Sequence, residues 1–193
     1  MEEFVRICRP VLWASWGVFI GVFVMNWLRI QRIRAASGEA RERRTQDRTS
    51  DRGLAMQGLA VAVVLSFRQP DTAAALAIAA TLVAPASAIL AWWALAHLRE
   101  QWRLEAVVTE AHRLVTSGPY AMVRHPIYTA FLGMVVATGL AVSRWEALIA
   151  GVLLFGLGTE IRVRAEERLL AQRFGRAHAE YKARVPAYVP FVR

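Results

Sequence analysis

The sequence contains a single cysteine, Cys8, and a single lysine, Lys182, among 193 residues. One cysteine allows no intramolecular disulfide and excludes a thiol-rich metal site. The four histidines lack the spacing of metal ligands, so we expect no metal. A glycine-rich loop after a strand pattern is also missing, and the common soluble nucleotide-binding folds therefore have no support in the sequence.

Apolar and basic residues are abundant instead, and they alternate in blocks along the chain. Hydrophobic residues make up 56% of the sequence, the mean hydropathy is positive, and the formal net charge is +9, carried almost wholly by arginine. This combination is typical of a small polytopic membrane protein. Nucleic-acid binding is not expected, because long uncharged stretches separate the basic residues and keep them from forming one basic face.

Five apolar stretches are candidates for transmembrane helices, each of which needs roughly 20 apolar residues to cross the hydrocarbon core. Two are long enough on their own, the second even with Pro85 in its middle, because neighbouring helices accommodate such a kink. Three are shorter and need flanking side chains that snorkel or a tilted neighbour. The long stretches are residues 11–30 and 72–97, and the short ones are residues 54–67, 127–142 and 145–161.

The connections between these stretches predict the turns and the orientation. Breaker residues at 68–71 and 143–145 predict tight helical hairpins. The segments 29–52, 98–125 and 162–193 hold 20 basic residues, against four on the opposite side. Because basic loops resist translocation, we expect an all-α integral membrane protein of about five spans with a cytoplasmic carboxyl terminus. The abundance of alanine and arginine is typical of a GC-rich bacterial genome, so we expect a bacterial inner-membrane protein with its active site facing the cytoplasm.

Polar residues able to do chemistry gather in two blocks of the expected cytoplasmic segments. The first block covers residues 112–128 and contains a Gly-Pro turn. Pro126 suits the first position of a helix, which puts His125 at a helix amino terminus, where unpaired N–H groups favour an anion. Arg124 and Tyr128 supply further donors around that point.

The second block covers residues 162–175 and is followed by an aromatic, proline-containing tail. Arg162 and Glu166 are four residues apart and therefore share one helical face just beyond the last span. We expect Arg164 and Glu167 to pair at the next position round. An ordinary salt-bridged helix leaving the membrane is the alternative interpretation, because surface pairs of this kind are common and weak.

Written out, the first block includes LVTSGPYAMVRHPIY, and the second begins about 40 residues later with EERLLAQRFGRAHAEYKARVPAYVPFV. Both blocks, in this order around a short hairpin, are similar to those of the isoprenylcysteine carboxyl methyltransferases and the related phospholipid N-methyltransferases. The similarity covers residues 103–193, nearly half of the chain. The earlier spans agree with the family only in number and orientation.

This resemblance implies an S-adenosylmethionine cofactor, held by the last two spans and a capping carboxyl-terminal helix. Residues 101–193 would be the methyltransferase catalytic region, and residues 1–100 its amino-terminal spans and basic cytoplasmic loop. The implied catalytic residues are Arg162, facing the methyl acceptor, and Glu166. The family usually has glycine where this chain has Ala130, which weakens the case for an identical acceptor pocket. The residues implied to bind the cofactor are His112, Arg113, Leu114, Val115, Tyr120, His125, Pro126, Ile127, Tyr128, Glu166 and Glu167.

Methyl transfer from a sulfonium is an in-line displacement, so a protein mainly aligns the reactants and excludes water. A carboxylate acceptor is ionised at neutral pH and needs only a positioning cation such as Arg162, whereas an amine needs a base such as Glu166 or Glu167. We therefore expect carboxyl methylation of an isoprenylated cysteine or similar lipophilic carboxylate entering from the bilayer. The alternatives are methylation of a phospholipid or other small lipophilic amine or thiol, an NADPH-dependent membrane reductase, and a non-enzymatic membrane scaffold.

Overall fold

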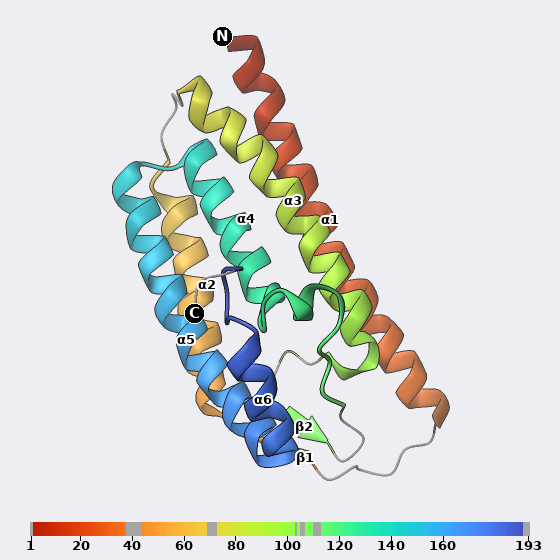
Figure 1. The fold of residues 1–193 in the computed structure, drawn as a ribbon. Coiled ribbons are helices and arrows are strands. Elements are labelled where there is room, and N and C mark those ends of the chain that lie inside the picture. Colours follow the sequence, from red (N-terminus) through yellow and green to blue (C-terminus); the bar gives the residue numbers. More distant parts are fainter. Residues whose placement is uncertain are drawn as a thin grey trace.

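The computed structural model of the protein describes residues 2–37, 44–68, 73–102, 104, 107–109 and 113–190. These residues form six α-helices and one two-stranded ribbon (Figure 1). The elements are, in chain order, α1 (Glu2–Ser37), β1 (Arg44–Gln46), α2 (Thr49–Ser66), α3 (Ala74–Leu98), the 3₁₀ turn η1 (Arg99–Gln101), β2 (Val107–Thr109), the 3₁₀ turn η2 (Gly118–Ala121), α4 (Pro126–Val142), α5 (Trp145–Phe174) and α6 (Arg176–Arg184).

The five apolar stretches of the sequence lie in α1 to α5, so an all-α fold is confirmed for the described residues, apart from the antiparallel ribbon of β1 and β2. Cys8–Ile33 and Ala74–Leu98 are long and apolar enough to cross a membrane, and Pro126–Val142 is a shorter apolar helix. The helix α3 runs through Pro85 without a break. The other two stretches are helical too, and a crossing of the bilayer by all five stays a prediction.

The two ends of the helical bundle differ in chemistry. The amino terminus lies at one end with the carboxyl end of α2, the amino end of α3 and the turn between α4 and α5 (Figure 1). There Ser143 pairs with Arg68, and the N–H of Arg144 donates to the carbonyl of Phe67 at 3.0 Å. Residues 69–71 of the first predicted turn lie outside the described residues. The opposite end, called the basic end below, holds the ribbon, α6 and the carboxyl ends of α1, α3 and α5. The described parts of the three basic segments therefore meet at one end, as the predicted orientation requires.

Small residues let the helices approach closely, as is common between membrane helices. The helices α2 and α5 meet at Gly53 and Gly158, where a Cβ on either glycine would meet the backbone carbonyl of the other. Alanines of α3 and α4 pack with Leu12 and Phe19 of α1. Ala130 is buried in this cluster. It is not among the described residues that line the large cavity at the basic end. Its methyl group therefore affects helix packing rather than the shape of the cavity wall.

Candidate active site

A cavity of about 780 Å³ lies at the basic end of the bundle. The helix α1 packs along α3, and α2 packs along α5, so the cavity lies between these two pairs, next to the start of α4. Its polar wall comes from the parts of each helix nearest the basic end. The polar side chains are Gln31, Gln57, Gln101, Arg113, Tyr120, Arg124, His125, Tyr128, Arg162, Glu166 and Tyr181.

The helix α1 supplies a second and mostly apolar surface, which we name the α1 wall. Its members recur every three or four positions and therefore face one side of the helix. Sequence reasoning missed this wall, because the first apolar stretch carries aromatic residues on more than one side. The α1 wall consists of Trp16, Phe19, Ile20, Phe23, Val24, Trp27, Ile30 and Gln31.

The backbone before α4 explains how the first sequence block reaches the cavity. Gly118 begins the turn η2 with a φ of +61°, a left-handed conformation that glycine adopts without strain. A Cβ at this position would also meet the ring of His97. Pro126 is the first residue of α4, as predicted, and His125 directly precedes the helix. Together the turn and the helix start put Tyr120 and His125 on one cavity wall.

Arg162, Tyr128 and Glu166 form a hydrogen-bonded row on this wall. Nε of Arg162 donates to the Tyr128 hydroxyl at 2.8 Å, and that hydroxyl donates to Oε1 of Glu166. Nη2 of Arg162 donates to the carbonyl of Leu104 at 2.6 Å, and the guanidinium carbon lies 5.6 Å from the centre of the Tyr128 ring. The shared face predicted for Arg162 and Glu166 is thus present, and Tyr128 connects the two side chains.

His125 joins the two sequence blocks. Its Nδ1 lies 3.7 Å from Oε2 of Glu166, and its Nε2 lies 3.4 Å from Oε1 of Glu167. The imidazole is buried, with only 6% of the side chain exposed. Residues from ahead of α4 and from the end of α5 therefore meet at one point, which a common ligand site requires.

Two buried donors on the cavity wall have no acceptor among the described residues. They are the hydroxyl of Tyr120 and Nη1 of Arg162, in side chains that are only 7% and 4% exposed. Burial raises the pKa of Tyr120, so its phenol stays a donor. Leaving a buried donor unpaired costs about 1–3 kcal/mol, so a ligand with acceptor oxygens would stabilise this wall. The carboxylate, ribose and adenine of S-adenosylmethionine offer acceptors for the Tyr120 hydroxyl, so this donor fits the implied cofactor, and Nη1 of Arg162 suits the carboxylate of a second ligand.

Ten of the predicted site residues line this cavity, and the other two, His112 and Glu167, are not among the described residues that line it. His112 lies outside the described residues. Glu167 lies behind His125 and is not among the described residues of the cavity wall. The predicted residues that do line the cavity are Arg113, Leu114, Val115, Tyr120, His125, Pro126, Ile127, Tyr128, Arg162 and Glu166.

Glu167 ties the carboxyl-terminal cap, defined as residues 176–190, to the start of α4. Its carboxylate accepts a hydrogen bond from Nε of Arg124 at 2.9 Å and another from Lys182, and Nη2 of Arg124 forms an ion pair with it at 2.7 Å. The N–H of Arg124 donates to the carbonyl of Pro186 at 2.8 Å. Burial alone would raise the pKa of Glu167, but hydrogen bonds from His125, Lys182 and Arg124 outweigh it and hold the pKa well below its usual range.

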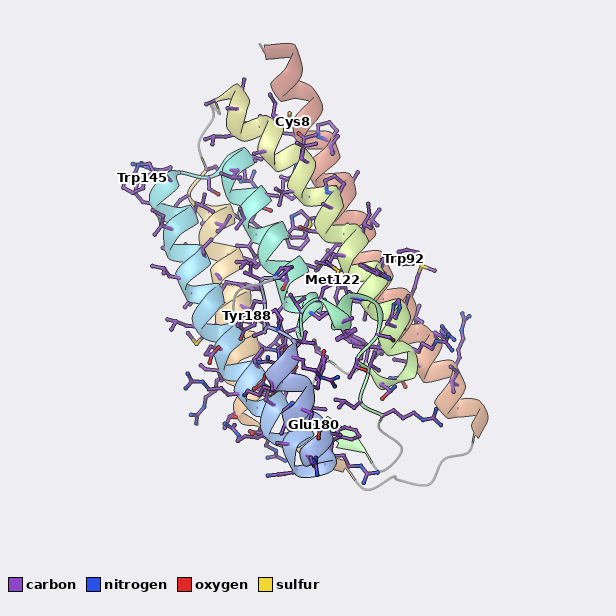
Figure 2. The ribbon with its side chains drawn as sticks, in the orientation of Figure 1. Cys8, Trp92, Met122, Trp145, Glu180 and Tyr188 are labelled. Carbon is purple, nitrogen blue, oxygen red and sulfur yellow. The ribbon has the colours of Figure 1, made fainter. Side chains whose placement is uncertain are left out.

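The predicted pair of Arg164 with Glu167 is wrong. Arg164 faces outward from α5 and binds Oε1 of Glu160 at 2.7 Å, one helical turn earlier. Glu167 faces the cap instead, because two cations and His125 surround it there. Glu160 also accepts a hydrogen bond at 3.0 Å from the hydroxyl of Tyr188, which lies near the middle of the molecule in Figure 2. The far end of the cap is thereby held against α5.

Replacing Glu167 with glutamine should lower the free energy of unfolding by about 2 kcal/mol at pH 7, because Arg124 loses its carboxylate partner. The depressed pKa means that this stabilisation is complete above the unfolded-state pKa of about 4.3 and is lost as the pH falls through the folded-state pKa. Thermal unfolding of both proteins at pH 7 and at about pH 3 should therefore show the difference shrinking in acid.

The matched control for this prediction is Glu180→Gln, which removes an exposed carboxylate paired with Arg176 on the same cap. Exposed pairs contribute about 0–1 kcal/mol, so this variant should unfold nearly as the parent protein does at both pH values. Equal effects of the two substitutions would contradict the role given to Glu167.

Taken together, the fold and the cavity define a helical protein with long apolar helices and a cavity lined by charged, buried side chains at one end. Residues 77–172, from α3 into the last turn of α5, match the model of the isoprenylcysteine carboxyl methyltransferase (ICMT) family. The chain therefore belongs to this family, which consists of integral membrane proteins. The matched region contains Tyr120, His125, Tyr128, Arg162 and Glu166, whereas the α1 wall and the cap lie outside it.

Relatives with curated names match part of the chain at moderate identity. The chain is 41% identical over 83 residues to protein-S-isoprenylcysteine O-methyltransferase B of Arabidopsis thaliana, covering 43% of this chain and 42% of the relative. It is 33% identical over 85 residues to the human protein-S-isoprenylcysteine O-methyltransferase, covering 44% and 30%. It is also 38% identical over 77 residues to the cobalt-zinc-cadmium resistance protein CzcN of Cupriavidus metallidurans, covering 40% and 35%. The matches thus span less than half of each relative.

Proposed function

We propose that this protein is a membrane methyltransferase that uses S-adenosylmethionine to esterify a lipophilic carboxylate, with an isoprenylated cysteine as the first acceptor to test. The observation that carries this proposal is the row of Arg162, Tyr128 and Glu166 in a cavity with one polar and one apolar side. Family membership supports the cofactor. The basic end, with its cavity, would face the cytoplasm, where the cofactor is found.

The polar wall offers groups of both signs for the cofactor. S-adenosylmethionine supplies an electrophilic methyl group on a positively charged sulfonium. Glu166 is the carboxylate on the cavity wall and would attract the cationic part of the cofactor. Tyr120 would donate its unpaired hydroxyl hydrogen to an acceptor oxygen. The remaining predicted residues around the start of α4 would complete the binding surface.

Arg162 would hold the methyl acceptor. Two of its guanidinium nitrogens are fixed by Tyr128 and the Leu104 carbonyl, so Nη1 is left to bind a carboxylate in one orientation. Esterification of an ionised carboxylate moves no proton, so the site needs alignment and charge and no general base. The cap, fastened through Glu167, would keep water away from the reacting groups.

The test uses the purified full-length chain in lipid nanodiscs, with methyl-labelled S-adenosylmethionine and N-acetyl-S-farnesylcysteine. We expect a labelled product that base releases as methanol, which identifies a methyl ester. The matched control is the same acceptor with a carboxamide in place of the carboxylate, and it should remain unlabelled. Base-stable label on a phospholipid amine or on a thiol would contradict the carboxylate assignment, and tighter binding of NADPH than of S-adenosylhomocysteine would contradict methyl transfer altogether.

A further inference from the structure

The α1 wall gives the cavity a long apolar arm. The helix α1 rises roughly 22 Å between Trp16 and Gln31. Apart from Gln31, all residues of the α1 wall are aromatic or aliphatic. Phe131 of α4 lies across this arm, with its ring centroid 6.2 Å from that of Trp16. The same cavity is lined by Arg162 at its polar side. A ligand that fills both parts has an anionic head and a long apolar chain.

Trp16 lies at the end of the arm farthest from the polar wall. Its Nε1 donates to Oγ1 of Thr138 at 2.9 Å, and the Thr138 hydroxyl in turn donates to the carbonyl of Met134 at 2.7 Å. The indole also packs edge to face on Phe19, with ring centroids 5.6 Å apart. Rotating the indole aside would leave its N–H unpaired in an apolar environment, which is costly. Trp16 is therefore held in place by both packing and hydrogen bonding.

Packed side chains continue beyond the indole. Leu12, one helical turn further along α1, is completely buried. It belongs to the same cluster as alanines of α3 and α4. A chain entering the arm from the polar side therefore meets Trp16 with no described space behind it.

We propose that Trp16 is a specificity-determining residue that sets the longest apolar chain the methyl acceptor can carry. The identity of the head group rests on the proposed function, whereas the length limit rests on the position and fixation of the indole. Replacing Trp16 with a smaller residue would lengthen the arm toward Leu12. The variant should then accept chains that the parent protein rejects.

The first experiment measures kcat/KM for N-acetylcysteine acceptors carrying geranyl, farnesyl or geranylgeranyl chains. In Trp16→Ala we expect the ratio of the longest to the middle chain to rise roughly tenfold over the parent value, a typical effect of reshaping an apolar pocket. Trp16→Phe, which keeps a packed ring but lacks the N–H, should shift the ratio less. Trp13→Ala is the matched control, because Trp13 is on the same helix, 45% exposed and not on the α1 wall.

A second experiment does not depend on methyl transfer. Prenyl alcohols of the same three lengths carry no carboxylate, and their effect on the melting temperature in nanodiscs reports occupancy of the arm. The longest alcohol should stabilise Trp16→Ala and Trp16→Phe more, relative to the middle one, than it stabilises the parent. If methylation fails but this shift appears, the proposed function is wrong and the length limit stands. If neither the kinetic ratio nor the melting shift changes in either variant, the prenyl chain of the ligand does not reach Trp16 and the inference is overturned.

Discussion

Replacing Arg162 with methionine should lower kcat/KM for the carboxylate acceptor by roughly a hundredfold. Methionine keeps much of the stem's volume but removes every donor, including the unpaired Nη1. A hydrogen bond to a charged group contributes about 1.5–3 kcal/mol, and each 1.4 kcal/mol is a factor of ten. Lysine should rescue only part of the loss, because one ammonium cannot contact Tyr128, Leu104 and a carboxylate with the same geometry. Steady-state kinetics in nanodiscs provide the measurement.

The Arg162 prediction needs readouts that separate acceptor binding from misfolding. Calorimetry with S-adenosylhomocysteine should give a Kd within about threefold of the parent value, which shows that the cofactor wall is intact. Arg164→Met is the matched control, since Arg164 lies on the same helix, faces outward and, within the described part of the chain, pairs with Glu160. Normal acceptor kinetics in Arg162→Met, or an equal loss in Arg164→Met, would remove Arg162 from the acceptor site.

The helices and the meeting of the two sequence blocks were predictable from short-range patterns. Long apolar runs bounded by breakers marked α1 and α3, and the proline at position 126 marked the start of α4. The four-residue spacing of Arg162 and Glu166 fixed their common face, because helical geometry needs only the local chain. The charge distribution predicted that both blocks lie at one end of the bundle, and His125 does reach Glu166 and Glu167 there.

The α1 wall was not predictable in the same way. In a soluble protein, polarity separates the buried face of a helix from its exposed face, but a membrane helix is apolar all round. Exposed residues such as Trp13 and Met25 have the same chemistry as the wall residues Trp16 and Phe19. Only the packing of α1 against α3 and α4 decides which face turns toward the cavity.

The partner of Glu167 shows a second limit of local reasoning. Spacing on α5 offered Arg164 as a neighbour, yet the carboxylate binds Arg124, which is 43 positions away in the sequence. This choice depends on the turn between α5 and α6, which brings Lys182 to the carboxylate, and on the position of the segment ahead of α4, which brings Arg124 there. Local periodicity carries no information about either.

Replacing Glu166 with glutamine should weaken binding of S-adenosylhomocysteine by roughly tenfold and binding of S-adenosylmethionine by more, because only the latter carries a sulfonium charge. Oε1 of Glu166 accepts a hydrogen bond from the Tyr128 hydroxyl. Glutamine is nearly isosteric with glutamate, and its carbonyl oxygen can accept the same hydrogen bond. The substitution therefore removes charge while preserving the row on the cavity wall. Calorimetry with both ligands measures the difference.

The Glu166 variants distinguish an electrostatic role from a structural one. If the carboxylate only positions Tyr128, glutamine should bind both ligands as the parent does, and Glu166→Ala alone should lose affinity. If its charge attracts the cofactor, both variants should lose affinity, with a larger loss for the cationic ligand. Glu146→Gln is the matched control, because Glu146 is an exposed carboxylate at the opposite end of the same helix. Equal weakening by Glu146→Gln would show that general charge, and not the place of Glu166 beside His125 and Tyr128, governs binding.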